Sequence, residues 1–158
     1  MNLYLVQHAE ALSKEEDPDR PLSAQGRADI EKVARFVAKN GDILVRQINH
    51  SGKTRARQTA EVLARVLEPT EGISDVPDLA PRDDPSVWVS YLADTTRNLM
   101  LVGHLPHLSR LAALLLCQDD TKKVIDFQMG GMACLGRDDE GHWSLRWLVT
   151  PELLIKVN

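Results

Sequence analysis

The feature that most constrains this chain is a regular alternation of apolar runs with segments of helical periodicity. Apolar runs lie within 2–7, 43–51 and 98–104. Apolar residues at helical spacing occupy 23–41 and 55–67, in the gaps between those runs. Strands that alternate with helices form a mostly parallel sheet with helices on both faces. We therefore predict an α/β fold, a three-layer αβα sandwich.

Two further helices and a C-terminal pair of strands complete the predicted fold. Helical patterns run over 84–94 and 106–117. Short strands follow within 132–136 and 142–149, joined by a turn-rich stretch. The length of 158 residues fits one domain, so we predict a single domain over 1–158.

Composition excludes several classes of partner. Hydrophobic residues make up 43% of the chain and charged residues 27%, which is a globular balance. A formal net charge of −4 argues against nucleic acid or an anionic membrane as the main partner. The start has no basic region typical of a signal peptide, so we predict a cytoplasmic protein with no membrane partner. Cys117 and Cys134 have no metal-binding spacing and are predicted to be buried free thiols.

Reactive or charged residues follow three of the predicted strands. His8 follows the first strand, His50, Ser51 and Arg55 follow the second, and His104 follows the most apolar one. In open α/β sheets, ligands bind beyond the carboxyl ends of the strands, so these side chains can converge on one pocket. Taken singly, each residue more often has a capping or solvated role, and the spacing alone leaves a shared site and separate roles equally open.

Several motifs stand in a fixed order along the chain. They are LYLVQHAE at 3–10, DRPLSAQG at 19–26, SGKTRARQTAEVL at 51–63, LVGHLPHLSRL at 101–111 and the closing segment ACLGRDDEGHWSLRWLVTPELL at 133–154. In this order they resemble the histidine phosphatase (phosphoglycerate mutase-like) superfamily, and within it the short, SixA-type phosphohistidine phosphatases. The resemblance covers nearly the whole chain and implies a phosphoglycerate mutase-like fold.

The resemblance also assigns catalytic roles to three residues. His8 matches the nucleophile that becomes phosphohistidine, His104 matches the second histidine, and Arg55 matches a phosphate-binding arginine. The chemistry is consistent with these residue types, because neutral imidazole is nucleophilic and fixed cationic donors stabilise charge on phosphoryl oxygens. The resemblance implies a metal-independent phosphatase without a cofactor.

One residue departs from the family signature R-H-G, which reads Gln7-His8-Ala9 in this chain. Gln7 still offers hydrogen bonds to a phosphate, but neutral ones, which are weaker than charge-assisted bonds. Arg20 is the preferred replacement for the missing charge, with Lys53 and Arg57 as other candidates. The departure fits a slow enzyme, an enzyme in which another cation replaces the missing arginine, or a non-catalytic phosphate binder.

A general acid is not evident in the sequence. Asp83, Asp84 and Glu10 are candidates, but we expect Asp84 to cap a helix and the other two to be solvated. His107 is predicted to lie at the surface or to serve the start of a helix, and His142 to be exposed in a hairpin. A phosphoramidate substrate explains why an acid can be missing, because its P–N bond is labile.

The short chain leaves little room for a helical lid over the site. An open, shallow site suits a phosphorylated protein, for example a histidine phosphotransfer domain, better than a small sugar phosphate. We therefore predict a phosphohistidine phosphatase, and we expect it to be a monomer. Two alternatives remain open: a weakened relative that binds a phosphate or phosphoprotein, and a small-molecule phosphatase.

Overall fold

The computed structural model describes residues 1–154 of the chain. In chain order its elements are β1 (Asn2–Gln7), α1 (Ala24–Asn40), β2 (Ile48–His50), α2 (Thr54–Leu67), β3 (Ile73–Asp75), α3 (Ser86–Asp94), β4 (Leu99–Gly103), α4 (His107–Cys117), β5 (Met132–Arg137), β6 (Trp143–Val149) and the short 3₁₀ helix η1 (Pro151–Leu153). Within the described residues, none of the helices combines the length and the apolar character needed to cross a membrane.

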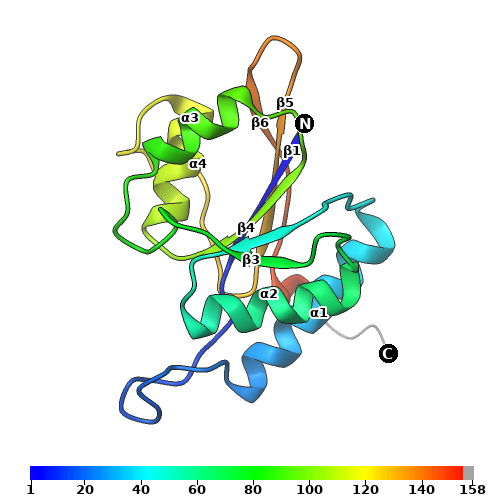
Figure 1. Cartoon of the computed structure of the whole chain (residues 1–158), viewed down its shortest axis with the longest axis vertical. Helices are drawn as coiled ribbons and strands as arrows, with labels where there is room; N and C mark the ends of the chain where they lie inside the picture. Colours follow the sequence, from blue (N-terminus) through cyan, green and yellow to red (C-terminus); the bar gives the residue numbers. More distant parts are fainter. Residues whose placement is uncertain (155–158) are drawn as a thin grey trace.

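The strands form one six-stranded sheet in the order β3-β2-β4-β1-β5-β6. The pairs β2–β3, β2–β4 and β1–β4 are parallel, whereas β1–β5 and β5–β6 are antiparallel. In Figure 1, α1 and α2 lie together on one side of the sheet, and α3 and α4 lie on the other. The predicted α/β sandwich with a mostly parallel sheet is thereby confirmed.

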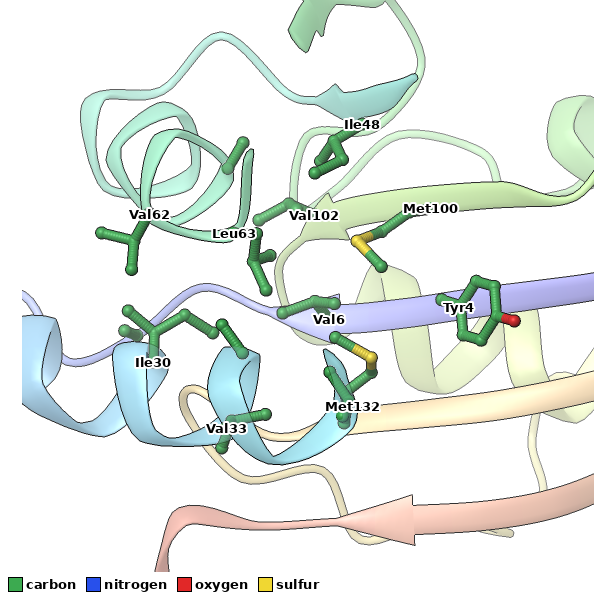
Figure 2. Packing of buried hydrophobic residues seen from close by; sticks show 14 of the residues in the cluster. Tyr4, Val6, Ile30, Val33, Ile48, Val62, Leu63, Met100, Val102 and Met132 are labelled. Atoms are coloured by element: carbon green, nitrogen blue, oxygen red, sulfur yellow. The ribbon is translucent and has the colours of Figure 1, made fainter. Parts of the chain in front are cut away.

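The hydrophobic core lies in two layers, one on each face of the sheet. Figure 2 shows the layer beneath α1 and α2, where Ile30 and Leu63 point toward Val6 and Val102. On the opposite face, α3 and α4 pack on alternate residues of the same strands, such as Leu5. Side chains alternate between the two faces of a strand. Because both faces are packed, the orientation of each strand is fixed, and so is the position of the residues that follow it.

The helix boundaries follow local sequence signals. The hydroxyl of Ser23 accepts the Gly26 N–H at 2.9 Å and caps the start of α1, as the sequence predicts. At the other end, the Gly41 N–H donates to Val37 and closes the last turn. The apolar residues at helical spacing, Ile30 among them, are buried against the sheet.

Two features of the fold differ from the prediction. Strand β3 is missing from the sequence-based assignment, because its three residues are too few for a periodic pattern and it pairs only at the sheet edge. Cys117 is exposed, although Cys134 is buried as expected. Cys117 ends α4 out of phase with the buried positions Leu108 and Leu111, so its side chain points away from the sheet.

Candidate active site

Two histidines lie side by side at the carboxyl ends of the central strands. Strands β1 and β4 pair in parallel, with Gln7 opposite Gly103, so the residues that follow them, His8 and His104, are neighbours. The backbone N–H of His8 donates to the Gly103 carbonyl at 3.0 Å. The two imidazole ring centroids lie 5.0 Å apart. The parallel register therefore brings together residues that are far apart in the sequence.

Arg55 joins the two histidines from the first turn of α2. This helix follows β2, the strand next to β4, so its start lies at the same edge of the sheet. Nε of Arg55 donates to Nε2 of His8 at 3.3 Å. The structure thus places the side chains of His8, Arg55 and His104 within one cluster.

The proton on His8 is located by its backbone partner. Nδ1 of His8 lies 2.8 Å from the carbonyl oxygen of Ala9, which only accepts hydrogen bonds, so Nδ1 carries the proton. Nε2 then keeps its lone pair, which accepts the bond from Arg55. Burial lowers the pKa of His8 to about 4; the bond to Ala9 opposes this, and the charges of Arg55 and Arg20 add to it. His8 is therefore a neutral imidazole at pH 7, with its free lone pair on Nε2.

In the part of the chain that the structure describes, His104 has a hydrogen-bond partner at Nε2 only. Nε2 of His104 lies 2.5 Å from the hydroxyl oxygen of Ser51. Nδ1 is buried without a hydrogen-bond partner among the described residues. Burial, followed by the nearby His8 and then Arg55, lowers the pKa of His104 to about 3, so this ring is also neutral at pH 7.

Both histidines are largely buried: His8 is 9% exposed and His104 is 2% exposed. The strands that carry them are covered by helices on both faces. A phosphoryl group that reaches Nε2 of His8 must displace the hydrogen bond from Arg55.

Gln7 occupies the last position of β1, beside the cluster. Its backbone carbonyl accepts the Gly130 N–H at 3.1 Å, which fixes the main chain. Its side-chain Oε1 is buried and has no partner within residues 1–154. By strand alternation the side chain faces the same layer as Leu3 and Leu5.

Arg20 is the candidate cation whose charge acts on the cluster most directly. Its positive charge lowers the pKa of both His8 and Arg55. An antiparallel bridge between Ala11 and Leu22 folds its loop back toward the end of β1, as predicted. Nε of Arg20 donates to a backbone carbonyl in this loop at 3.2 Å, which leaves the rest of the guanidinium for other partners.

Of the other two candidate cations, Lys53 acts on the cluster, whereas Arg57 faces a carboxylate on its own helix. Lys53 is exposed at the start of α2, and its charge contributes to the lowered pKa of His104. Arg57 is exposed as well and faces Glu61 one turn along the same helix, at 3.9 Å.

Thr59 connects the loop after His8 to α2, a role that the sequence analysis did not assign. Its hydroxyl accepts the buried Ala9 N–H at 3.0 Å and donates to the Arg55 carbonyl at 2.7 Å. Gln58, the residue before it, accepts the Leu22 N–H at 2.8 Å. Both residues belong to the RARQT motif at 55–59, which the sequence analysis had singled out. The motif alone did not indicate which segments the two side chains contact.

Gly26 explains the glycine of the DRPLSAQG motif. A Cβ at this position would lie 2.1 Å from the backbone carbonyl oxygen of Glu10. Helix α1 therefore packs directly on the segment that follows His8, and only glycine allows the approach.

The candidate acids are all engaged elsewhere. Glu10 is exposed, and its carboxylate accepts the Ser23 hydroxyl at 2.6 Å. Asp84 accepts the N–H of Ser86, the first residue of α3, at 2.9 Å, although Pro85 rather than Asp84 stands at the N-cap position; hydrogen bonding to Ser86 lowers the pKa of Asp84. Asp83 accepts the Ala80 N–H at 2.8 Å. Within residues 1–154 no group of three or more His, Cys, Asp or Glu side chains could hold a metal ion.

His107 and His142 differ in their exposure. His142 is exposed beyond the β5–β6 turn, as predicted. His107 begins α4, but it is fully buried, so the predicted surface position is wrong. The cause is its place at the start of a helix that packs tightly on the sheet, next to Leu108. Burial lowers the pKa of His107.

The sequence and the fold identify the family. The sequence model of the histidine phosphatase superfamily (branch 1) matches residues 3–82, just over half of the chain. The chain therefore belongs to the histidine phosphatase superfamily. A sequence search of the curated proteins finds no match.

Solved structures extend the similarity over the whole fold. The protein histidine phosphatase SixA in complex with tungstate is 24% identical, with a TM-score of 0.85 over 98% of this chain and 99% of that chain. A protein assigned as phosphohistidine phosphatase SixA from Agrobacterium tumefaciens is 25% identical, with a TM-score of 0.77 over 95% and 97%. An alpha-ribazole phosphatase from Shigella flexneri is 15% identical, with a TM-score of 0.74 over 96% and 97%.

Proposed function

We propose that this protein is a metal-independent phosphatase that removes phosphoryl groups from protein phosphohistidine through a phosphorylated His8. The observation that carries the proposal is the arrangement around His8. The Ala9 carbonyl directs the proton to Nδ1, while Nε2 keeps its lone pair beside the guanidinium of Arg55. A neutral nucleophile next to a fixed cation is what phosphoryl transfer requires.

The proposed reaction has two displacements. In the first, Nε2 of His8 forms a bond to phosphorus, the P–N bond of the substrate breaks, and the leaving imidazole takes a proton from solvent. In the second, water attacks the phosphorus of phospho-His8, the Nε2–P bond breaks, and inorganic phosphate leaves. Arg55 stabilises charge on the peripheral oxygens in both steps, because phosphoryl transfer depends mainly on positioning and electrostatics.

The choice of a phosphohistidine substrate has two supports. The candidate acids Glu10, Asp83 and Asp84 are each bound to another group of the protein, and a labile P–N bond can break without a positioned acid. The chain also resembles SixA structures over its length. We propose a phosphorylated protein, such as a histidine phosphotransfer domain, as the partner. The cytoplasmic location and the monomeric state stay predictions.

Gln7 favours a second candidate, a weakened relative that binds phosphate with little turnover. A neutral amide in place of the family arginine removes a charge-assisted bond, and loss of one donor to a developing oxyanion costs about 10²–10³ in rate. Arg20, whose charge acts on His8, is our proposed compensation. A third candidate, a small-molecule phosphatase, rests on likeness in fold to an alpha-ribazole phosphatase.

Phosphate release from a phosphohistidine protein tests the first proposal. We expect wild type to release phosphate and His8→Ala to lose at least about 10³ of the rate, because no nucleophile remains. Equal rates of phosphate release for the two proteins would exclude the proposal that the protein is a phosphatase acting through His8. A panel of phosphorylated small molecules, assayed with the same pair, addresses the third candidate: faster release from any of them would displace phosphohistidine as the preferred substrate.

The substitution Gln7→Arg tests whether the natural protein is weakened. If Arg20 already supplies the missing charge, Gln7→Arg raises kcat/KM by less than about threefold, while Arg20→Gln lowers it by about tenfold or more. A gain of about 10² in Gln7→Arg would show that the charge is missing in wild type and would favour the weakened binder.

A further inference from the structure

The turn between β2 and α2 connects the candidate site to a buried histidine that the mechanism does not use. Ser51 stands in this turn, with its hydroxyl oxygen 2.5 Å from Nε2 of His104. The Lys53 N–H also points to this hydroxyl, at 3.4 Å. The orientation of the His104 ring therefore depends on where the turn holds Ser51.

His50 closes the turn from the other side. Its Nδ1 accepts the Gly52 N–H at 3.1 Å, and the residue is 4% exposed. Gly52 has a φ of +81°, and a Cβ there would lie 2.8 Å from the carboxylate oxygens of Asp75. The turn thus combines a left-handed backbone, a close contact with β3 and one imidazole acceptor.

The hydrogen bond to Gly52 exists in only one protonation state of His50. An imidazole accepts through Nδ1 when it is neutral, but imidazolium has N–H donors on both nitrogens. The charged groups that face the ring are Asp75 from β3 and Arg57 and Glu61 from α2. Burial outweighs Asp75 and lowers the pKa of His50, which favours the neutral form at pH 7.

We propose that Ser51 and His50 are positioning residues for the phosphatase reaction: Ser51 orients the His104 ring, and neutral His50 holds the turn that carries Ser51. This inference rests on the proposed function. Protonation of His50 turns its Nδ1 from an acceptor into a donor that faces the Gly52 N–H. The turn then loses its closing bond, and His104 loses its fixed partner as the pH falls.

The substitution pair Ser51→Ala and Ser51→Thr tests the direct contact. Removal of this partly buried hydrogen bond is expected to lower kcat for phosphate release by about tenfold with little change in KM, because it acts on orientation rather than binding. Ser51→Thr keeps a hydroxyl and should recover most of that loss. Equal kcat in wild type and Ser51→Ala would overturn this part of the proposal.

The pair His50→Asn and His50→Leu tests the acid-sensitive acceptor. The Asn oxygen stands near the position of Nδ1 and accepts at every pH, whereas Leu accepts at none. We expect His50→Asn to recover most of the activity at pH 8 and to move the acid limb of the kcat profile to lower pH. His50→Leu should lose about tenfold at pH 8. An unchanged acid limb in folded His50→Asn would overturn the proposed role of His50.

A readout without turnover separates this proposal from the proposed function. Ring ¹⁵N and ¹H NMR signals of His104 report its hydrogen bonding in the free protein. Ser51→Ala and His50→Leu should shift them at pH 8, and Ser51→Thr should restore them. If wild type releases no phosphate, the proposed function fails, and these signals still decide the positioning role. If wild type is active and the signals do not move, only the positioning role fails. Should His50→Leu not fold by circular dichroism, His50→Asn decides the role of His50 and the Ser51 pair decides the contact with His104.

Discussion

The chemistry of His8 is set by a few atoms around one ring. The Ala9 carbonyl holds the proton on Nδ1, and the Arg55 guanidinium lies at Nε2. Burial removes the water that would stabilise imidazolium, so the pKa falls to about 4. A buried ring of this kind remains a nucleophile across the physiological range, since the protonated form appears only in acid.

Thr59 links two parts of this arrangement. Its hydroxyl takes the Ala9 N–H and donates to the Arg55 carbonyl, so it couples the backbone partner of His8 to the helix that carries the arginine.

We predict that Thr59→Val destabilises the protein by about 1–3 kcal/mol, because the buried Ala9 N–H loses its acceptor while the side-chain volume is kept. Thr59→Ser, which keeps the hydroxyl, should cost less than about 1 kcal/mol. Urea unfolding of both variants measures the difference, and equal stabilities would contradict the assigned bond.

At the scale of elements, α1 and α2 hold the segment after β1 from two sides. The start of α1 packs on the Glu10 backbone through Gly26, and α2 binds the neighbouring Ala9 N–H through Thr59. Gln58 of α2 accepts the Leu22 N–H in the loop that leads into α1. The motifs that resemble the family therefore mark contacts between elements as well as chemistry.

We predict that Gly26→Ala destabilises the protein by about 1–3 kcal/mol and lowers any phosphatase activity, because the new methyl group collides with backbone rather than with a flexible side chain. The matched control is Arg27→Ala, at the next position of the same helix, whose side chain is exposed. Its stability should stay within about 0.5 kcal/mol of wild type. Thermal unfolding compares the two, and a neutral Gly26→Ala would show that the segment moves aside easily.

For the whole molecule, folding buries several neutral imidazoles at one edge of the sheet. The ordinary histidine pKa is 6.5, whereas it is about 4 for His8 and about 3 for His104 in the folded protein. Between these values the unfolded chain binds protons that the folded chain does not, so stability rises with pH.

We predict that the free energy of unfolding falls between pH 7 and pH 5 by roughly 2 kcal/mol for each of these two histidines. Their contribution is fully present above pH 6.5 and is lost as the pH falls toward the folded values. Urea titrations at both pH values measure the change. His8→Asn should reduce it by about 2 kcal/mol, while substitution of the exposed His142 by Gln should leave it intact. A stability that does not change between the two pH values would contradict the burial of neutral rings.

The sequence by itself determined the order of the elements and the residues at the strand ends. Apolar spacing encodes which face of a helix or strand is buried, and this is a local property, so α1, α2, β1 and β4 were predictable. The position of His8 after β1 and of His104 after β4 followed directly, and the family motifs pointed to Arg55.

Only the tertiary structure decided how these residues meet. The strand order β2-β4-β1 brings the three strand ends together, and no local pattern encodes which strands are neighbours. The Ser51–His104 bond, the depth of both rings and the burial of His107 follow from that packing. A side chain's partners depend on segments distant along the chain, whereas its preferred face depends on its immediate neighbours, and that difference divides what was predicted here from what was not.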